Sequence, residues 1–362
     1  MNAEHVYLRP TAFVDAPFGL DDRVARLAGG LVWFSAAELV KVDDGGSVSV
    51  QLISVEDLVE SLAELPPEVA TAWSRLTAPR LPLTLRHRTI RFDQPQVVGI
   101  VNATPDSFSD GRQYADSDGA IAAGHEMAAA GAAIIDVGGE STRPGSKAVW
   151  EGDEAARILP IVEQLASGGV AVSADTRKSA VMEQALAAGA TMINDVSALT
   201  WDDRSPSVVA GSDCAVVLMH HQGSPETMQD DPRYDRPVLF EVYDWLEARI
   251  AAAVEAGIAR ERILIDPGFG FGKNVQHNLQ LMNGLAMLHG LGCPIMLGAS
   301  RKRTIGALSN EAPVNRRIGG SIALALKAAE QGVQLLRVHD VPETLQALRV
   351  WRGLRDCALT PS

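Results

Sequence analysis

The sequence predicts an α/β protein built as a (β/α)8 TIM barrel, and three observations carry this prediction. Between residues 97 and 340 a short apolar run ends eight times in a polar or charged residue. Most stretches between these runs have the apolar spacing of helices. Glycines that suit the positive φ of a helix C-terminus follow four of the predicted helices, at Gly131, Gly189, Gly257 and Gly332. Alternating strands and helices of this number close into a barrel.

The chain before the repeat is expected to form two smaller parts. Residues 1–80 follow no strand–helix repeat, and we expect a small, mainly helical N-terminal extension of unknown role, followed by the barrel at 81–362. Helical pieces are predicted around 22–28, after the N-cap residue Ser54, and over 68–76 behind a Pro-Pro pair. The alternating apolar residues of 83–91 predict a hairpin that closes the barrel floor.

The eight predicted units follow in order along the barrel. The strands are expected at 97–102, 133–137, 170–174, 191–194, 215–219, 263–266, 294–297 and 335–338. The helices after them are expected at 117–130, 151–166, 178–188, 205–210, 238–256, 275–289, 315–330 and 342–354. Strand ends of such barrels converge on one mouth, so the residues that end these strands are candidates for an active site.

Composition narrows the class of protein. The chain has 362 residues, is 46% hydrophobic and carries a formal net charge of -13. The acidic balance disfavours nucleic-acid and anionic-membrane partners, which need a cationic surface. Its three cysteines, Cys214, Cys293 and Cys357, have no metal-ligand spacing. With neither a signal peptide nor an apolar run of membrane-spanning length, the expected location is the cytoplasm.

Four strand ends carry carboxylates or a carboxamide: Asp136, Asp175, Asn194 and Asp266. A carboxylate accepts paired N–H donors, so such a group suits a flat, nitrogen-rich heterocycle. The alternative is that single members cap the helices that follow them, and Asp175 fits this alternative well.

Cations follow the last two strands. Ser300-Arg301-Lys302 comes after the seventh strand, and Arg337 and His339 lie on one face of the eighth. Phosphate sites in these barrels commonly lie at the loops after strands seven and eight, so we predict a site for a phosphate or pyrophosphate. The alternative is ordinary surface charge, but Arg337 stands inside an apolar run.

Three loops are distinctive. Residues 102–111 and 138–145 have the length and glycine content of lids, and the Asn102 side-chain oxygen could complete an Mg2+ shell beside pyrophosphate. Residues 266–273 are glycine-rich without the pattern of a nucleotide P-loop, which favours close backbone approach to a flat ring with Phe271 as its stacking wall. His220 and His221 point to opposite faces of a strand, so a shared zinc ion is not expected.

Six ordered motifs resemble the signatures of the dihydropteroate synthase family. They are VNATPDSFSDG (101–111), IIDVGGESTRPGS (134–146), INDV (193–196), LIDPGFGFGKN (264–274), GASRK (298–302) and RVHDV (337–341). The resemblance covers about residues 83–355. It implies a transferase of folate biosynthesis that joins 6-hydroxymethyl-7,8-dihydropterin pyrophosphate to p-aminobenzoate, needs Mg2+, is a target of sulfonamides, and forms a homodimer.

The resemblance also implies roles for particular residues. The pterin site maps onto Asp175, Asn194, Asp266, Lys302, Met219, Phe271 and Gly298. The pyrophosphate site maps onto Asn102, Arg337, His339 and Asp136, with Asn102 at the metal. The p-aminobenzoate site and loop closure map onto Phe108, Thr142, Arg143, Pro144 and Ser300. The implied mechanism is dissociative: pyrophosphate leaves first, and the amine attacks a resonance-stabilised pterin cation.

Two positions depart from the family pattern. Arg177 stands where the family often has serine, and His221 stands where some members have methionine. Neither is expected to transfer a proton, so we expect them to affect the shape of the pocket rather than activity. Two other functions are alternatives. A methyltetrahydrofolate-dependent corrinoid methyltransferase would not need the ESTRPG loop or the predicted anion site, and a non-catalytic pterin-binding paralogue would be expected to lack residues such as Arg143 and Lys302.

Overall fold

A barrel of eight parallel strands forms the body of the molecule. The computed structural model describes residues 4–43, 45–104, 117–141, 146, 148–223 and 227–360. The strands pair in the order β12-β11-β10-β9-β8-β7-β14-β13, and a parallel bridge between Ile265 and Ile295 closes the circle. Their bounds are β7 Gln96–Asn102, β8 Ile134–Gly138, β9 Val172–Asp175, β10 Met192–Asp195, β11 Ala215–Met219, β12 Ile263–Asp266, β13 Met296–Leu297 and β14 Leu335–Val338. The predicted (β/α)8 barrel is confirmed.

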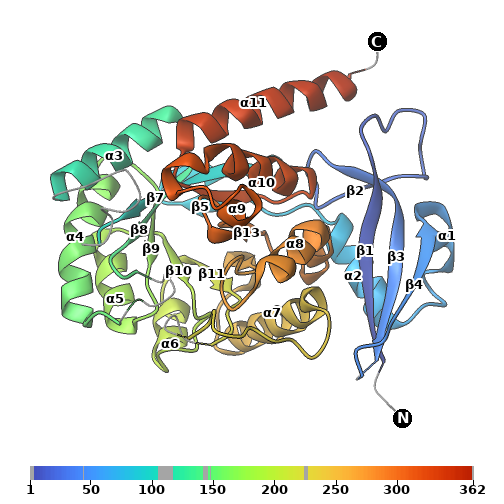
Figure 1. Cartoon of the computed structure of the whole chain (residues 1–362), viewed down its shortest axis with the longest axis horizontal. Helices are drawn as coiled ribbons and strands as arrows, with labels where there is room; N and C mark the ends of the chain where they lie inside the picture. Colours follow the sequence, from blue (N-terminus) through green and yellow to red (C-terminus); the bar gives the residue numbers. More distant parts are fainter. Residues whose placement is uncertain are drawn as a thin grey trace.

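Helices surround the barrel between successive strands (Figure 1). They are α3 Ser117–Ala130, α4 Glu151–Ser167, α5 Ser179–Ala188, α6 Ser205–Ala210, α7 Val238–Glu255, α8 Val275–Gly284, α9 Arg303–Leu308, α10 Ile318–Glu330 and α11 Val341–Ala358. The helix predicted over 275–289 ends at Gly284 and continues as the 3-10 segment η3, Leu285–Leu291. All of η3 is buried against the N-terminal part of the chain, so packing there overrides the helical periodicity.

The interior of the barrel is closed at one end by the predicted hairpin. Strands β5 (Leu83–Leu85) and β6 (Arg88–Ile90) pair antiparallel. Their apolar side chains form one buried cluster with residues from the first halves of the barrel strands: Leu83, Leu85, Ile90, Phe92, Val98, Ile134, Ala171, Met192, Ala215, Val217, Leu264, Met296 and Leu335. The hairpin therefore fills the floor, and the opposite end of the barrel is the mouth.

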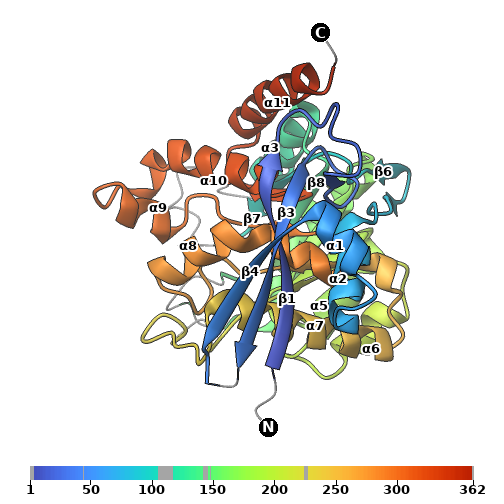
Figure 2. The same ribbon diagram turned by 90° about the vertical axis from the view of Figure 1, so that its right-hand side faces the viewer.

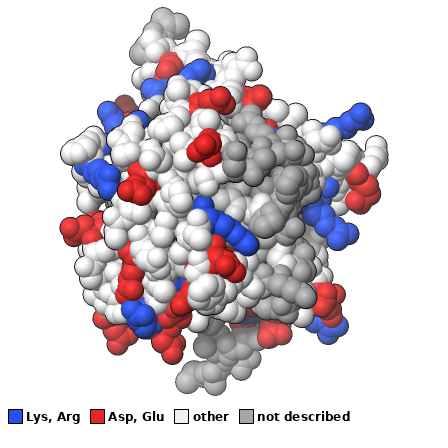
Figure 3. Space-filling view, turned by 90° about the vertical axis from the view of Figure 1, so that its left-hand side faces the viewer, with Lys and Arg blue, Asp and Glu red and all other residues white. Residues whose placement is uncertain are grey.

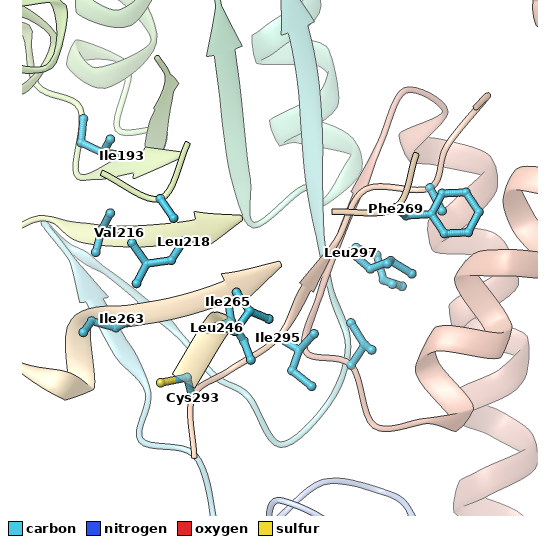
Figure 4. Close-up of a cluster of buried hydrophobic side chains, with 14 of the residues drawn as sticks. Ile193, Val216, Leu218, Leu246, Ile263, Ile265, Phe269, Cys293, Ile295 and Leu297 are labelled. Carbon is cyan, nitrogen blue, oxygen red and sulfur yellow. The ribbon is translucent and has the colours of Figure 1, made fainter. Parts of the chain in front are cut away.

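The other face of each strand packs outward against the helices. Figure 4 shows part of this layer, in which Val216 and Leu218 of β11 and Ile263 and Ile265 of β12 lie near Leu246 of α7. Because neighbouring strand residues point to opposite faces, the outward layer fixes which residues face the interior. This alternation positions the site described below.

The N-terminal extension is built mainly of strands, so the prediction of a mainly helical extension was wrong. It holds a four-stranded antiparallel sheet of β1 Glu4–Val14, β2 Ala25–Arg26, β3 Trp33–Asp43 and β4 Val48–Ser54. Strand β3 is buried on both faces: Leu39 belongs to the core of the extension, whereas Val40 and Val42 pack against the barrel. An apolar run of this kind lacks the alternation by which a half-buried strand is recognised.

Two of the three predicted helical pieces are present in the extension. Helix α1 (Val55–Ser61) begins at Ser54, whose hydroxyl accepts a hydrogen bond from the Asp57 N–H at 3.0 Å. Helix α2 spans Pro67–Thr77. The piece expected around 22–28 instead consists of turns and the short strand β2.

The extension lies against the flank of the barrel, not under its floor. Its sheet runs beside α7 and α8 (Figure 1), and the floor strand β6 lies away from it in the perpendicular view (Figure 2). The Tyr7 ring of β1 packs on Phe240 of α7, with ring centroids 4.8 Å apart. One edge of the sheet therefore reaches toward the mouth of the barrel.

Two properties of the described residues bear on membrane and nucleic-acid partners. Within the described ranges, none of the helices combines the length and apolarity that a membrane crossing requires. On the face in Figure 3, the described Lys and Arg side chains are interspersed with Asp and Glu side chains. On that face, the described residues form no continuous basic area.

Candidate active site

Strand alternation directs one set of side chains into the mouth. In each strand, positions two or four residues beyond the floor cluster face the interior again. These positions include Asn102, Asp136, Asp175, Asn194, Met219, Asp266, Gly298, Arg337 and His339. The predicted strand-end residues are thus brought together because they share the parity of the floor residues. Asp136, Asn194, Met219 and Asp266 are buried, and the others are half-buried.

Arg337 connects the ends of two neighbouring strands of this ring, β8 and β9. Its Nε donates to Asp136 at 2.6 Å, and its second guanidinium nitrogen donates to Asp175 at 2.7 Å. The Asn194 amide also donates to Asp136, at 3.0 Å. Burial raises the pKa of Asp175, against the opposing effect of Arg337, and the nearby Asp136 raises it further. Despite its own burial, Arg337 has a raised pKa because the carboxylates of Asp136 and Asp175 stabilise its charge.

A lysine and a third aspartate occupy the other side of the ring. The Lys302 ammonium lies 4.2 Å from the centroid of the Phe271 ring and donates to the Phe269 carbonyl. Burial lowers the pKa of Lys302 to about 7, although Asp266 opposes that shift. Burial likewise raises the pKa of Asp266, which accepts from the Gly268 N–H at 2.7 Å. Burial therefore acts against the charged form of both groups.

Gly298 leaves room between these groups. A Cβ there would lie 3.8 Å from the Arg337 Cδ and 4.0 Å from an Asp266 carboxylate oxygen. Any larger side chain would extend into the space that the two charged groups share. The predicted glycine wall is consistent with a flat ring held at this place.

Ser300 and His339 form the contact between the loops after β13 and β14. The Ser300 hydroxyl lies 3.1 Å from His339 Nδ1 and accepts from the His339 N–H at 3.3 Å. Arg301, the middle residue of the predicted anion-binding run Ser300-Arg301-Lys302, has its guanidinium on Asp340. It forms a two-point ion pair with Asp340, at 2.9 and 2.5 Å, and has a φ of 58°. This left-handed turn at Arg301 separates Ser300 from Lys302.

The glycine-rich loop lies against the end of β11. Gly268 has a φ of +67°, and a Cβ there would lie 1.7 Å from the His220 carbonyl oxygen. The loop ends at Lys273, a fully buried lysine that we did not predict as part of the site. Its ammonium donates to the Phe271 carbonyl at 3.0 Å and lies 2.8 Å from His220 Nδ1. The apolar and glycine neighbours of Lys273 were the available signal that it is buried.

A second buried charge cluster stands beside the mouth, and sequence reasoning missed most of it. Arg177 donates to Glu140 at 3.1 Å, and Lys178 pairs with Glu140 at 3.2 Å and with Glu154. The Arg177 guanidinium also stacks 3.6 Å from the Trp201 ring centroid. Glu140 accepts from the Val149 N–H at 2.8 Å, which ties together the two ends of the segment between them.

Four of the predicted p-aminobenzoate residues, Phe108, Thr142, Arg143 and Pro144, lie outside the described residues. Their placement remains a prediction. Within the ranges that are described, three or more His, Cys, Asp or Glu side chains nowhere gather into a metal-binding group. One buried oxygen of Asp136, Oδ1, has no hydrogen-bond partner there. An oxygen donor of this kind suits a hard cation that retains water and substrate ligands.

Comparisons with known proteins identify relatives of the whole barrel. The sequence profile of the family described as pterin binding enzyme matches residues 98–339. The dihydropteroate synthase of Neisseria meningitidis serogroup B is 46% identical over 270 residues, which cover 73% of this chain and 94% of that protein. That of Escherichia coli K12 is 45% identical over 263 residues, covering 72% and 92%.

Solved structures agree with the sequence relatives. The Yersinia pestis dihydropteroate synthase in a sulfonamide drug complex has a TM-score of 0.73 and 44% identity, and the match covers 76% of this chain and 100% of that one. The Xanthomonas albilineans enzyme in complex with 7,8-dihydropteroate has a TM-score of 0.68 and 43% identity, with 76% and 99% covered.

Proposed function

Because the chain belongs to the dihydropteroate synthases of the pterin-binding enzyme family, we propose that the mouth of its barrel is the site at which the two substrates of that reaction meet. The chain is a transferase. It condenses 6-hydroxymethyl-7,8-dihydropterin pyrophosphate with p-aminobenzoate and releases 7,8-dihydropteroate and pyrophosphate. The methyltransferase and the non-catalytic paralogue are set aside because the relatives at this identity are synthases.

We propose that Asp175, Asn194 and Asp266 accept the N–H donors of the pterin ring, with Met219, Phe271, Gly298 and Lys302 around it. The raised pKa values of Asp175 and Asp266 support this role, since both carboxylates are buried with too few cations to hold their charge. A ligand that donates hydrogen bonds to them would stabilise the ionised form. The same contacts would stabilise positive charge that develops on the ring as pyrophosphate departs.

We propose that Arg337 and His339 bind the pyrophosphate, with Asn102 and Asp136 at its metal ion. The oxygen donors of Asn102 and Asp136 face the same interior, and Asp136 keeps one oxygen without a partner in the described part of the chain, which fits Mg2+. When bound, Mg2+ would supply stabilisation of the charge on the leaving group. Arg337 would contribute a fixed cation beside it.

We propose that p-aminobenzoate enters last and lies near Ser300, between the loops that carry Phe108 and Thr142, Arg143 and Pro144. The tie between Glu140 and Val149 supports this arrangement, because it holds the base of the second loop at the mouth. The sulfonamide bound by the Yersinia pestis relative suggests that sulfonamides compete with p-aminobenzoate here.

The observation that carries the site assignment is the contact of one arginine with two strand-end aspartates inside the mouth. The test is formation of dihydropteroate from the two substrates, with and without Mg2+, by the wild type and by Asp175→Asn. We expect product only with Mg2+. Asp175→Asn should weaken pterin pyrophosphate binding by about 2–3 kcal/mol, and unchanged affinity would contradict the assignment.

Two further expectations stay proposals. A homodimer is the proposed assembly, to be checked by light scattering at several concentrations. A cytoplasmic location is proposed from the folate-pathway reaction, to be checked by fractionation of cells that express the chain.

A further inference from the structure

Tyr7 makes one of the contacts between the extension and the barrel near its mouth. The Tyr7 hydroxyl donates to Asp244 at 2.8 Å and accepts from Arg236 at 3.1 Å, and Arg236 also donates to Asp244 at 2.7 Å. The Tyr7 ring packs edge-on against Tyr243, with centroids 5.6 Å apart. Burial and the adjacent Asp244 carboxylate raise the pKa of Tyr7, so its hydroxyl stays protonated and donates.

A second contact reaches the same segment. Gly46 lies in the turn between β3 and β4 and has a φ of +79°. A Cβ there would lie 3.2 Å from the Asp235 carbonyl oxygen and 3.8 Å from the Arg236 Cα. The turn therefore packs directly on residues 235 and 236. Two separate places in the extension hold this short part of the loop between β11 and α7.

The same loop hydrogen-bonds the glycine-rich wall of the pocket. The Tyr234 hydroxyl donates to the Gly272 carbonyl at 2.9 Å, and the Gln229 amide donates to the Gly270 carbonyl at 2.7 Å. These two carbonyls flank Phe271, whose ring lies against Lys302. A shift of Tyr234 would therefore move the wall on which we place the pterin.

We infer that the N-terminal extension positions the pterin wall of the active site through Tyr7, Arg236 and Tyr234. The inference rests on the proposed pterin site. It makes Tyr7 and Tyr234 positioning residues, since neither touches a reacting group. The family profile begins at residue 98, and the Neisseria meningitidis relative matches only 73% of this chain while 94% of it is covered. This positioning of the pterin wall is therefore expected in chains that have the extension.

The test removes the Tyr7 hydroxyl and keeps its ring. For Tyr7→Phe we expect the Kd of the pterin pyrophosphate, measured by calorimetry, to rise about three- to tenfold, which is the net effect of losing one ordinary hydrogen bond. The KM for p-aminobenzoate at saturating pterin substrate should stay unchanged. Arg355→Met is the matched control, because Arg355 holds the other end of the extension through Asp15 and Leu31 and has no hydrogen bond to the described residues of the loop between β11 and α7. It should leave the Kd unchanged.

Two further measurements separate positioning from general loss of structure. Amide exchange over 227–237 and 268–273 should accelerate in Tyr7→Phe but not in Arg355→Met. Tyr234→Phe should weaken pterin binding by a similar factor, and the double variant Tyr7→Phe/Tyr234→Phe should lose less than the product of the two factors, because both act along one route.

The outcomes distinguish the inference from the function on which it rests. Wild-type affinity and exchange in Tyr7→Phe, or fully multiplicative effects in the double variant, would overturn the positioning role while leaving the synthase intact. Failure of the wild type to bind pterin pyrophosphate would overturn the proposed pterin site and this inference together.

Discussion

Two buried charge clusters lie side by side at the mouth of the barrel, and they differ in how their charges are balanced. The pocket cluster consists of Asp136, Asp175, Asp266, Lys302 and Arg337. The bracing cluster consists of Glu140, Glu154, Arg177 and Lys178. In the bracing cluster two acids meet two bases within ion-pair distance. In the pocket cluster three acids share two bases across a wider space.

The shifts in pKa follow this difference. Burial alone would raise the pKa of Glu140, yet the Val149 N–H and the cations Arg177 and Lys178 lower it. In the pocket cluster burial prevails, so the pKa values of Asp175 and Asp266 rise and that of Lys302 falls. A self-sufficient cluster braces the fold, whereas an incomplete one leaves interactions for a ligand to supply.

The sharpest way to break the pocket cluster is to remove Arg337. Arg337→Met leaves Asp136 and Asp175 without their shared cation and takes away the proposed pyrophosphate ligand. We expect kcat/KM to fall about a thousandfold, roughly 4 kcal/mol of lost stabilisation of the negative charge that develops on the leaving group. Unfolding by urea should change by only about 1 kcal/mol, because the two carboxyls can take up protons. A loss in kcat/KM below about tenfold would contradict the proposed role.

Removing Arg177 should reduce stability more than activity, which is the reverse of the result expected for Arg337. Arg177→Ser leaves the buried Glu140 with fewer partners and removes the stacking on Trp201. We expect the free energy of unfolding to fall by about 2–3 kcal/mol. The KM for p-aminobenzoate should rise about tenfold, because Glu140 anchors the loop after β8 that we propose binds this substrate.

The control for this change is an exposed ion pair. Arg204 pairs with Glu183, and their side chains are 63% and 47% exposed, so Arg204→Ser should cost less than about 0.5 kcal/mol. Equal losses of stability in Arg177→Ser and Arg204→Ser would show that the bracing cluster stabilises the fold no more than an exposed ion pair does.

A third prediction concerns the order of binding. We expect pyrophosphate to occupy the pocket cluster before p-aminobenzoate binds. Binding of p-aminobenzoate should be at least about tenfold tighter with pyrophosphate and Mg2+ present than without them, since the anion completes the cation side of the pocket before the loops close. Calorimetry with and without pyrophosphate measures the ratio. Equal affinities would argue against ordered closure.

Most of the barrel could be predicted because its signals are local. The strand ends Asp136, Asp175 and Asp266 follow buried apolar runs, and the parity of a strand dictates that they face the interior. Strand β3 could not be predicted in the same way, because packing on both faces removes its alternation. No local signal shows that Arg177 meets Glu140, since the two follow different strands, β8 and β9, and the parallel pairing of those strands brings them together.

The positions of the extension and of Arg301 were unpredictable for a related reason. The hairpin at 83–91 contains its own apolar alternation, so its place in the floor follows from its sequence. Contacts such as Tyr7 with Asp244 join segments 237 positions apart, and nothing local to either residue announces them. Arg301 was predicted to bind an anion because of its neighbours Ser300 and Lys302, and its side chain forms an ion pair with Asp340.

The smallest expected effect is a change in proton uptake, and it bears directly on why the pocket cluster is incomplete. The pKa of Lys302 is lowered to about 7, below its value in the unfolded chain, because burial outweighs the attraction of Asp266. Compared with the unfolded chain, the folded enzyme without ligand therefore disfavours the charged form of Lys302. The charged lysine destabilises the fold fully below about pH 7, and this destabilisation is relieved as the pH rises and the lysine loses its proton. A bound pyrophosphate would favour the charged form and raise that pKa again.

Binding of the pterin pyrophosphate should consequently take up almost no proton at Lys302 near pH 6 and a growing fraction of one proton from pH 7 to pH 8.5. Calorimetry in buffers of different ionisation enthalpy measures this uptake. Lys302→Arg, whose guanidinium stays charged throughout, should lack the rise, whereas Lys327→Arg on the outer helix α10 should retain it. Proton uptake that is independent of pH in the wild type would show that Lys302 is already charged in the empty pocket, and the electrostatic contrast between the two clusters would then rest on the aspartates alone.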